Sequence, residues 1–410
     1  MTQPGSPADP HPLPNSAPGA AAIVDHLLTR RTATRSELAS VTGLGRTAVS
    51  ALLHRLVGRG VVIEADGAPG PRGARVRLAV ADHLVLAAGV AGDEAVAALV
   101  EVAGTEYARY EEPVAFDDED PRGATAAPLD ALAIVVDRAV ARAARDERRL
   151  ATAGIVVQGA VAGSPELAVL DDAFGLEPAD VIGALRDRSE RLAGVEPAFI
   201  VPAFLVSAPA ARAADEAAAR GIAVVLHVTG EPQVAAGIAI AGMPYVGAHG
   251  LAATIGHLPV VPDGVRCGCG QRGCLATVAS PRVILERAEL ADVERHHGRR
   301  AALDELTARV AEAEDRARWA WLDAAFWIGR ALQMVVPSID PGVITVGGWW
   351  APLVGDIEAA FRDNRPSLGG GALASIPPIV AATTVGSTGS VAMRQARERL
   401  RSTIVAAATA

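Results

Sequence analysis

The three cysteines of the chain lie within eight residues, and this cluster restricts the local fold more than any other feature of the sequence. Cys267, Cys269 and Cys274 are separated by glycines, and His257 precedes them by ten residues. Three thiolates and an imidazole at this spacing can hold one Zn²⁺ in a tetrahedral loop. Four protein ligands would fill the site, so we expect a structural zinc ion with no open position. The alternative is a loop of three reduced cysteines beside an unrelated histidine.

A second pattern lies near the N-terminus and predicts three helices. Apolar residues from Ile23 to Leu28 form one helical stripe, and Thr34-Arg-Ser-Glu37 is a capping box that opens a helix through about Thr42. A glycine-containing turn of three residues precedes a third helix, expected from Arg46 to about Val57. Two helices joined in this way are typical of a helix-turn-helix.

The residues after the third helix predict a wing. Short apolar runs at 61–63 and 76–78 are expected to form strands, and the loop at 67–75 between them is rich in Gly, Pro and Arg. The outward residues of the third helix and the arginines of the wing are the candidate DNA contacts. These candidates are Arg46, Thr47, Ser50 and His54 on the helix, beside the small Ala51, and Arg72 and Arg75 in the wing.

Charge is distributed in the way such a head requires. The first 80 residues carry nine arginines against five acids, a net charge of +4, whereas the whole chain carries −9. A basic end on an acidic body favours one DNA-contacting module over a protein that coats nucleic acid along its length. The alternative is a small three-helix bundle that binds other proteins through a solvated arginine face.

The remaining sequence predicts a soluble α/β body. Residues 1–19 are rich in proline and are expected to be a disordered leader without a signal peptide. The uncharged stretch from Pro232 to Pro262 contains many glycines, which favours buried strands with tight turns over a membrane helix. Strands at 84–90, 96–102, 153–157 and 343–346 alternate with helices, at about 128–145 and 311–336, the second of which we expect to stop at Pro337. We expect a cytoplasmic protein.

With these residues in view, the chain resembles the ROK family of repressors and sugar kinases, and in particular its regulators. The similarity is most specific from Ile255-Gly256-His257 through Cys267 to Leu275, and Gly347-Gly348 and Gly386-Ser-Thr-Gly389 resemble the family's glycine turns near the nucleotide cleft. The resemblance implies a two-lobed actin/hexokinase-like (ribonuclease H-like) α/β fold. We therefore predict a winged helix-turn-helix at 20–80, a first lobe at 84–200 and a second lobe at 201–400 with its zinc loop at 257–275. The C-terminal helix is free to return to the first lobe.

The kinase residues of the family are missing where the resemblance would place them. The region 88–95 lacks the Asp-x-Gly-x-Thr phosphate loop, and Ala208 stands where the family has the Asp that deprotonates the sugar hydroxyl. Thr254 and Ala276 replace two further glutamates of the family pattern. An alanine cannot abstract a proton, so we expect no enzyme activity.

The expected function is that of a sequence-specific transcriptional regulator, and we expect a repressor rather than an activator. Its partners would be double-stranded DNA with a pseudo-palindromic operator, a second copy or three further copies of the chain, and a small-molecule effector that need not be a sugar. Two other hypotheses remain open: a sugar kinase with an appended head, and an interaction protein that does not bind DNA.

Overall fold

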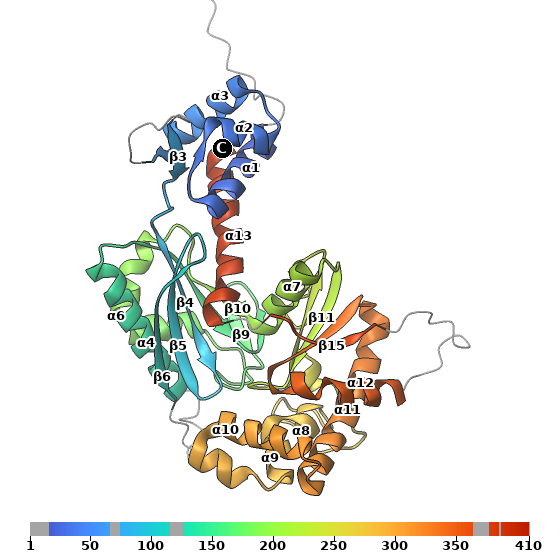
Figure 1. The fold of residues 1–410 in the computed structure, drawn as a ribbon. Coiled ribbons are helices and arrows are strands. Elements are labelled where there is room, and N and C mark those ends of the chain that lie inside the picture. The colour runs from blue at the N-terminus through green and yellow to red at the C-terminus, as the bar shows by residue number, and fades with distance from the viewer. Residues whose placement is uncertain (1–15, 66–73, 115–125, 364–376, 385–386, 410) are drawn as a thin grey trace, which may run out of the picture.

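The N-terminal residues form a winged helix-turn-helix, which we call the head (Figure 1). The computed structural model describes residues 16–65, 74–114, 126–363, 377–384 and 387–409. The head has a three-stranded sheet in the order β1-β3-β2. Its elements are α1 (Ser16–Arg30), β1 (Ala33–Thr34), α2 (Arg35–Thr42), α3 (Arg46–Gly58), β2 (Val62–Glu64) and β3 (Arg75–Leu78).

Local sequence signals account for where the helices of the head begin and end and for how they pack together. The capping box is present, because the Thr34 hydroxyl accepts from the Glu37 amide while the Glu37 carboxylate accepts from the Thr34 amide. Gly43 ends α2 in the left-handed conformation, with φ of 66°. Leucines and valines of α1, α2 and α3 then bury their apolar stripes against one another. The first helix begins at Ser16, so the leader predicted for 1–19 is wrong at 16–19.

Lobe 1 follows the head and is built on a five-stranded mixed sheet in the order β10-β7-β4-β5-β6. Helix α4 packs on one face of this sheet, and the strand side chains that point toward α4 are apolar. Its elements are β4 (Leu84–Ala91), β5 (Glu94–Glu101), β6 (Glu106–Pro113), α4 (Ala126–Arg145), β7 (Leu150–Val157), β8 (Ala160–Ala162), β9 (Leu167–Val169), α5 (Val181–Arg188), α6 (Glu190–Val195), η1 (Glu196–Ala198) and β10 (Phe204–Ser207).

Lobe 2 repeats the topology of lobe 1. Its sheet has the order β13-β12-β11-β14-β15, with three antiparallel strands followed by two parallel ones, as in lobe 1. The expected two-lobed α/β architecture is therefore confirmed. The elements are α7 (Ala208–Arg220), β11 (Val224–Thr229), β12 (Ala235–Ile240), β13 (Met243–Tyr245), η2 (Ile255–His257), α8 (Ala276–Ala279), α9 (Pro281–Arg287), α10 (Ala291–Ala311), α11 (Asp315–Ile339), β14 (Val343–Gly347), η3 (Gly348–Leu353), α12 (Val354–Asp363) and β15 (Ile379–Ala381).

Several boundaries differ from those expected. The predicted boundary between the lobes, at 200/201, lies before β10. It is wrong, because β10 pairs in parallel with β7 and completes the sheet of lobe 1. Strand β6 was missed, because its burial alternates and its outer residues are charged. Helix α11 runs through Pro337 to Ile339. The helix continues past Pro337 although proline lacks the amide that would bond to the carbonyl of residue 333.

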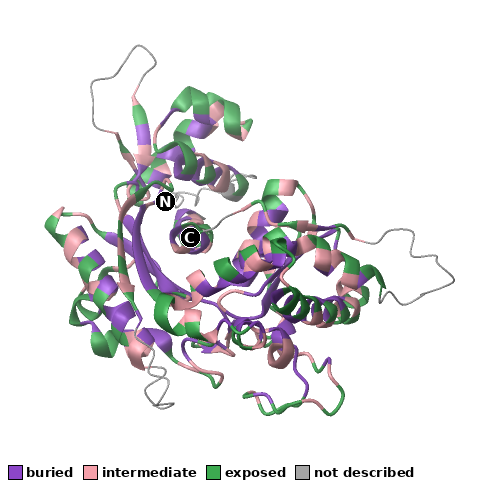
Figure 2. Ribbon diagram, turned by 60° about the horizontal axis from the view of Figure 1, so that its bottom comes forward, coloured by how far each residue is buried: buried purple, intermediate pink, exposed green. Residues whose placement is uncertain are grey.

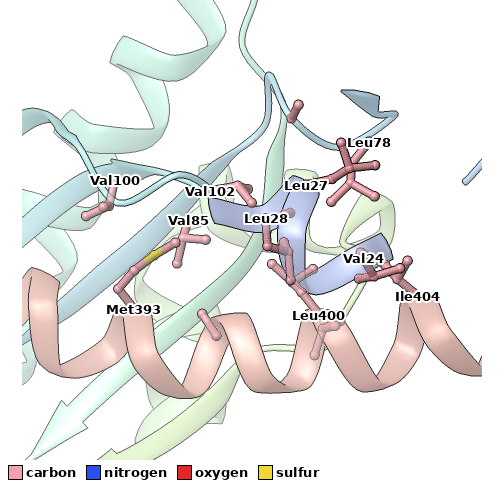
Figure 3. Close-up of a cluster of buried hydrophobic side chains, with 14 of the residues drawn as sticks. Val24, Leu27, Leu28, Leu78, Val85, Val100, Val102, Met393, Leu400 and Ile404 are labelled. Carbon is pink, nitrogen blue, oxygen red and sulfur yellow. The ribbon is translucent and has the colours of Figure 1, made fainter. Parts of the chain in front are cut away.

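The last helix, α13 (Thr388–Thr409), joins the head to lobe 1. It packs on β4, β5 and β7 with one part of its length and on α1 with another, and Figure 1 shows it running from the sheet to the head. In Figure 3, Met393 lies near Val85 and Val100, while Leu400 and Ile404 lie beside Val24 and the leucines of α1. One continuous hydrophobic core therefore includes the head, α13 and one face of the lobe 1 sheet.

Polar contacts reinforce this junction. Arg401 of α13 donates to both carboxylate oxygens of Asp25 in α1, at 2.5 and 3.2 Å. Arg59, directly after α3, donates to the carbonyl oxygens of Ala407 and Ala408 at the end of α13. The C-terminal carbonyls of a helix lack intrahelical partners, so the arginine also caps α13.

Burial follows the layers of the fold. Figure 2 shows the strands of the two lobe sheets as mostly buried, with exposed residues on the outer sides of the surrounding helices. The stretch from Pro232 to Pro262 contains β12, which is buried as expected, and β13, which is largely exposed and therefore differs from the expectation of buried strands. Within the described ranges, no helix has the length and apolar character needed to cross a membrane.

The continuous core predicts that α13 stabilises the head. Leu400 is fully buried, so Leu400→Ala should lower the free energy of unfolding by about 2–5 kcal/mol and accelerate amide hydrogen exchange in α1. Leu251→Ala is the control, because Leu251 is 47% exposed and its loss should have little effect. Unchanged exchange in α1 of a destabilised Leu400→Ala protein would contradict the coupling.

Candidate functional site

The four residues predicted as metal ligands come together in lobe 2. The side-chain donor atoms of His257, Cys267, Cys269 and Cys274 all lie within 4.8 Å of one another. The Cys269 and Cys274 sulfur atoms are 3.7 Å apart, and the Cys267 sulfur is 3.6 Å from His257 Nδ1. Zn–S bonds of about 2.3 Å and Zn–N bonds of about 2.0 Å require separations of this size in a tetrahedral site. The cluster can therefore hold a metal ion.

The loop around the cluster is fixed by its backbone. Pro259 pairs with Cys274, and Arg266 with Arg272, as isolated β-bridges. Gly273 has φ of 71°, and a Cβ atom there would lie 1.8 Å from the Val261 carbonyl oxygen. Only glycine fits this position, because a side chain would clash with backbone and also be strained at positive φ.

Protonation of the cluster residues is coupled to metal binding. Burial lowers the pKa of His257, which keeps its imidazole neutral as a metal ligand requires. Burial and the neighbouring Cys269 raise the pKa of Cys274 to about 12. A bound cation would supply the positive charge that a buried thiolate otherwise lacks, so metal binding and deprotonation are coupled.

A small cavity of about 30 Å³ adjoins His257, between the two lobes. Ser207, Pro209 and Ala210 line it from the start of α7, and Thr254 lines it beside η2. Ala208 is instead buried in the hydrophobic core, and Ala276 lies at the start of α8 outside the described lining. The cavity has room for one or two water molecules.

The β4–β5 turn occupies the region where the family's phosphate loop was sought. Ala91 pairs with Glu94, so Gly92 and Asp93 close the hairpin as a two-residue turn, with Gly92 at φ of 67°. A Cβ atom at Gly298, where α10 kinks, would lie 2.7 Å from the Asp93 carboxylate. The tip of this hairpin therefore lies directly against lobe 2.

A much larger groove of about 1,410 Å³ lies where the head, α13 and the two lobes meet. Asp25 and Thr29 line it from the head, and Met243 and Val246 line it from lobe 2. Arginines of α13 form another wall, at positions 394, 397, 399 and 401. Three of them pair with acidic residues, whereas Arg397 donates to the backbone oxygen of Val102. Sequence reasoning did not identify this groove.

The candidate DNA-contacting residues of α3 share one exposed face. Arg46, Thr47, Ser50 and His54 are all exposed, whereas the opposite face of the helix is buried. Arg46 forms no hydrogen bond or ion pair with the described residues. Gly45 precedes α3 without a side-chain cap, so the first amides of the helix lack a side-chain acceptor.

The two wing arginines differ. Arg75 is half-exposed, but its guanidinium donates to the Thr32 hydroxyl at 2.9 Å and carbonyl at 3.1 Å, and it lies 3.6 Å from the Glu37 carboxylate. It therefore fastens β3 to the start of α2, a role that the sequence did not indicate. Arg72 lies outside the described residues, as does Gly386 of the second glycine turn.

A buried polar cluster was also missed. His227 of β11 is buried, and its Nδ1 lies 3.0 Å from the Thr345 hydroxyl of β14. Burial and the nearby Arg212 charge lower the pKa of His227 to about 3. Its Nε2 and Arg212 Nε have no hydrogen-bond partner in the described part of the chain. A single histidine in an apolar strand gives no sequence signal of this kind.

Comparison with known proteins identifies the family. The profile of the ROK family matches residues 90–350, so the chain belongs to the ROK family. A glucokinase of Halalkalibacterium halodurans is 34% identical over 135 residues, which are 30% of this chain and 41% of that protein. The DNA-binding transcriptional repressor Mlc of Escherichia coli is 33% identical over 135 residues, 32% of this chain and 33% of that protein. The aligned segments thus span less than half of either relative.

Two solved structures share the fold over longer stretches. A ROK family transcriptional regulator, described as a homologue of the E. coli Mlc protein, has a TM-score of 0.68 at 16% identity, with 96% of this chain and 99% of that chain covered. A ROK family glucokinase from Streptomyces griseus has a TM-score of 0.56 at 22% identity, with 76% of this chain and 98% of that chain covered. The match to the regulator thus extends over more of this chain than the match to the kinase.

Removing one thiol tests the metal cluster. Cys269→Ser should release the metal and lower the thermal stability of lobe 2, because three remaining donors bind more weakly than four. Elemental analysis and thermal unfolding of purified proteins measure both effects. Arg266→Ala, an exposed change in the same loop, is the control and should keep the metal. A Cys269→Ser protein with one equivalent of metal and an unchanged melting curve would disprove the assignment.

The buried histidine predicts a pH effect on stability. The folded-state pKa of His227 lies below its unfolded value of about 6.5, so the unfolded chain takes up the proton first as the pH falls. This residue should therefore cost about 2 kcal/mol of stability between pH 7 and pH 5. Denaturant unfolding at both pH values should show a smaller loss for His227→Gln than for the unmodified protein. The exposed His54→Gln should keep the full loss; identical losses in all three proteins would contradict this account.

Proposed function

We propose that this chain is a sequence-specific DNA-binding transcriptional regulator, with a ROK body that senses or dimerises and does not phosphorylate sugars. The observation that carries the proposal is the winged helix-turn-helix, whose α3 presents a free polar face while its core is continuous with α13 and lobe 1. The fold match over 96% of the chain to a ROK transcriptional regulator supports it. Binding to genomic DNA would place the protein in the cytoplasm.

The exposed start of α3 suits a major groove. Recognition helices contact base edges with their N-terminal residues, and Arg46 has the free guanidinium that a bidentate contact to guanine needs. Thr47 and Ser50 would take a base edge or a phosphate, with His54 one turn further along. The free amides after Gly45 would donate hydrogen bonds to a phosphate. Arg72 and Arg75 would serve the wing, with Arg75 mainly a structural support for it.

The small cavity argues against a sugar kinase. Small-molecule sites usually have volumes of about 300–1,000 Å³, and this one has about 30 Å³. None of the described residues that line it is an Asp or Glu, so no carboxylate is present to take the proton of a sugar hydroxyl. The apolar Pro209 and Ala210 occupy one wall. Ala208, Thr254 and Ala276 fit the same conclusion, because none can replace a catalytic carboxylate.

The metal in the cluster is proposed to be zinc with a structural role. Three thiolates and one imidazole are the donor set that structural zinc sites use, and the donor separations fit it. Such a site contributes on the order of 10 kcal/mol to local folding. Zinc would hold the loop 257–275 and thereby fix η2 and the wall of the cavity.

An effector, if the protein uses one, would bind in the large groove. Groove residues come from α1, α13 and lobe 2, so a ligand there contacts the head and the body at once. Its volume and its mixture of arginines, carboxylates and apolar side chains favour a molecule larger than a hexose that carries both apolar and polar or charged groups. A ligand can shift the position of the head only by its different affinity for the two arrangements.

The proposal is tested by selecting genomic DNA fragments on the purified full-length protein and footprinting the enriched ones. We expect a protected pseudo-palindrome. Arg46→Ala should weaken binding to it by about 1–3 kcal/mol and relax the preference at one base pair of each half-site. Arg282→Ala, an exposed arginine of lobe 2, is the matched control and should bind as the unmodified protein does. An unchanged preference in Arg46→Ala would exclude that residue as a base reader.

A further inference from the structure

Arg397 of α13 differs in its charge environment from the other arginines that line the large groove. Those three arginines each pair with an acidic residue. The two lining carboxylates outside these pairs are engaged as well, because Glu106 lies 3.8 Å from Arg109 and Glu398 lies 3.8 Å from Arg401. Within the described lining, Arg397 is therefore an arginine without a carboxylate partner.

The guanidinium of Arg397 is half-buried and held in place by the β5–β6 turn. Its Nε donates to the Val102 carbonyl oxygen at 3.0 Å. A Cβ atom at Gly104 would lie 2.9 Å from its Nη2, and Gly104 has φ of 106°, so a side chain is excluded where the guanidinium lies. Burial lowers the pKa of Arg397, and no nearby carboxylate offsets this effect.

The free end of Arg397 suits a carboxylate. A guanidinium has five N–H donors in a planar fork, and in the described part of the chain only the Nε donor of Arg397 has a protein acceptor. The two terminal nitrogens can therefore bind both oxygens of one carboxylate. One unpaired positive charge balances one negative charge, whereas a phosphate monoester carries about two at pH 7. A monocarboxylate matches the charge of the site better.

The groove also offers apolar surface to a ligand. Val100 and Met393 line it beside Arg397, and Figure 3 shows their side chains near each other. On the wall formed by lobe 2, Met243 is 55% exposed and Val246 is 40% exposed. Ligand sites usually combine such apolar walls with a few polar groups that fix orientation. A bare anion would leave these walls in water, so the ligand that fits has an apolar body.

We propose that the large groove binds an organic monocarboxylate with an apolar body, and that Arg397 holds its carboxylate. The proposal rests on the proposed function, because it names the class of effector for the groove assigned there. Arg397 extends from α13 and bonds to the β5–β6 turn, so its ligand lies against both elements. Binding therefore strengthens the contact of α13 with lobe 1, and α13 carries the head (Figure 1).

Calorimetric titration of the full-length protein with two carboxylates, dodecanoate and 1-naphthaleneacetate, tests the proposal. At least one of them should bind. Acetate has the charge without the body, and 1-naphthaleneacetamide has the body without the charge. Each should bind at least about tenfold more weakly than the better carboxylate, because each lacks one of the two interactions. Absence of binding by both carboxylates would overturn the proposal, as would equal binding of the naphthalene acid and its amide.

Substitution of the arginine tests its role. Arg397→Gln should weaken binding of the carboxylate by about 10- to 100-fold, because the ligand loses a charge-assisted hydrogen bond. Arg397→Lys keeps the charge without the planar fork and should give a smaller loss. Arg282→Gln, an exposed arginine of α9 outside the groove, is the matched control and should bind as the unmodified protein does. Circular dichroism melting shows whether each variant folds. Unchanged affinity in a folded Arg397→Gln protein would overturn the proposal.

Hydrogen exchange locates the ligand independently of the variants. The bound carboxylate should slow amide exchange in the β5–β6 turn and in α13, because it contacts both elements. Protection that appears only around His257 would place the ligand in the small cavity and overturn the proposal.

The outcome is separable from the proposed function. A protein that protects a genomic DNA site but binds neither carboxylate would overturn the groove assignment and leave the regulator intact. Carboxylate binding that depends on Arg397, in a protein that binds DNA without preference, would support the groove site and count against the regulator.

Discussion

The packing of α13 between α1 and the sheet of lobe 1 is the interaction on which the rest of the structure depends. A winged head of about 60 residues has only a small core of its own, and small cores are marginal. Leu400 and Ile404 extend that core into the body, while Arg401 and Arg59 bind α1 and the end of α13. Any movement of α13 relative to lobe 1 must therefore move the head or cost buried apolar contacts, which makes α13 the physical link between the body and the head.

The two lobes have the fold of the ROK family, and the space around them is divided between a small cavity and a large groove. The two lobes share one strand order, and a cavity of about 30 Å³ lies beside His257. The Cys/His cluster fixes one wall of that cavity, and the Gly92–Asp93 turn meets α10 across the lobes. The larger open space of the body is the groove beside the head, at about 1,410 Å³.

Local signals in the sequence predicted much of this structure. Thr34 and Glu37 located α2 because a capping box acts over four residues, and the spacing from His257 to Cys274 located the cluster because glycines leave few ways to fold that loop. Other features depended on partners distant in the chain. Nothing in Phe204–Ser207 indicates which sheet receives β10, and Arg75 looks like a DNA contact until Thr32 and Glu37 are seen beside it. The apolar stripe of α13 predicts a buried helix, but not that its partner is the head.

Binding of the full-length protein to DNA from upstream of its own gene, over a series of salt concentrations, tests the central claim most directly. A scrambled duplex of the same length and composition is the control. Contacts with phosphates weaken steeply as salt rises and do not depend on sequence, whereas contacts with base edges preserve a preference. The account predicts that the upstream fragment is bound more tightly than the scrambled one at every salt concentration. Equal binding to both fragments that vanishes together at moderate salt, followed by failure of any genomic fragment to be enriched, would contradict it.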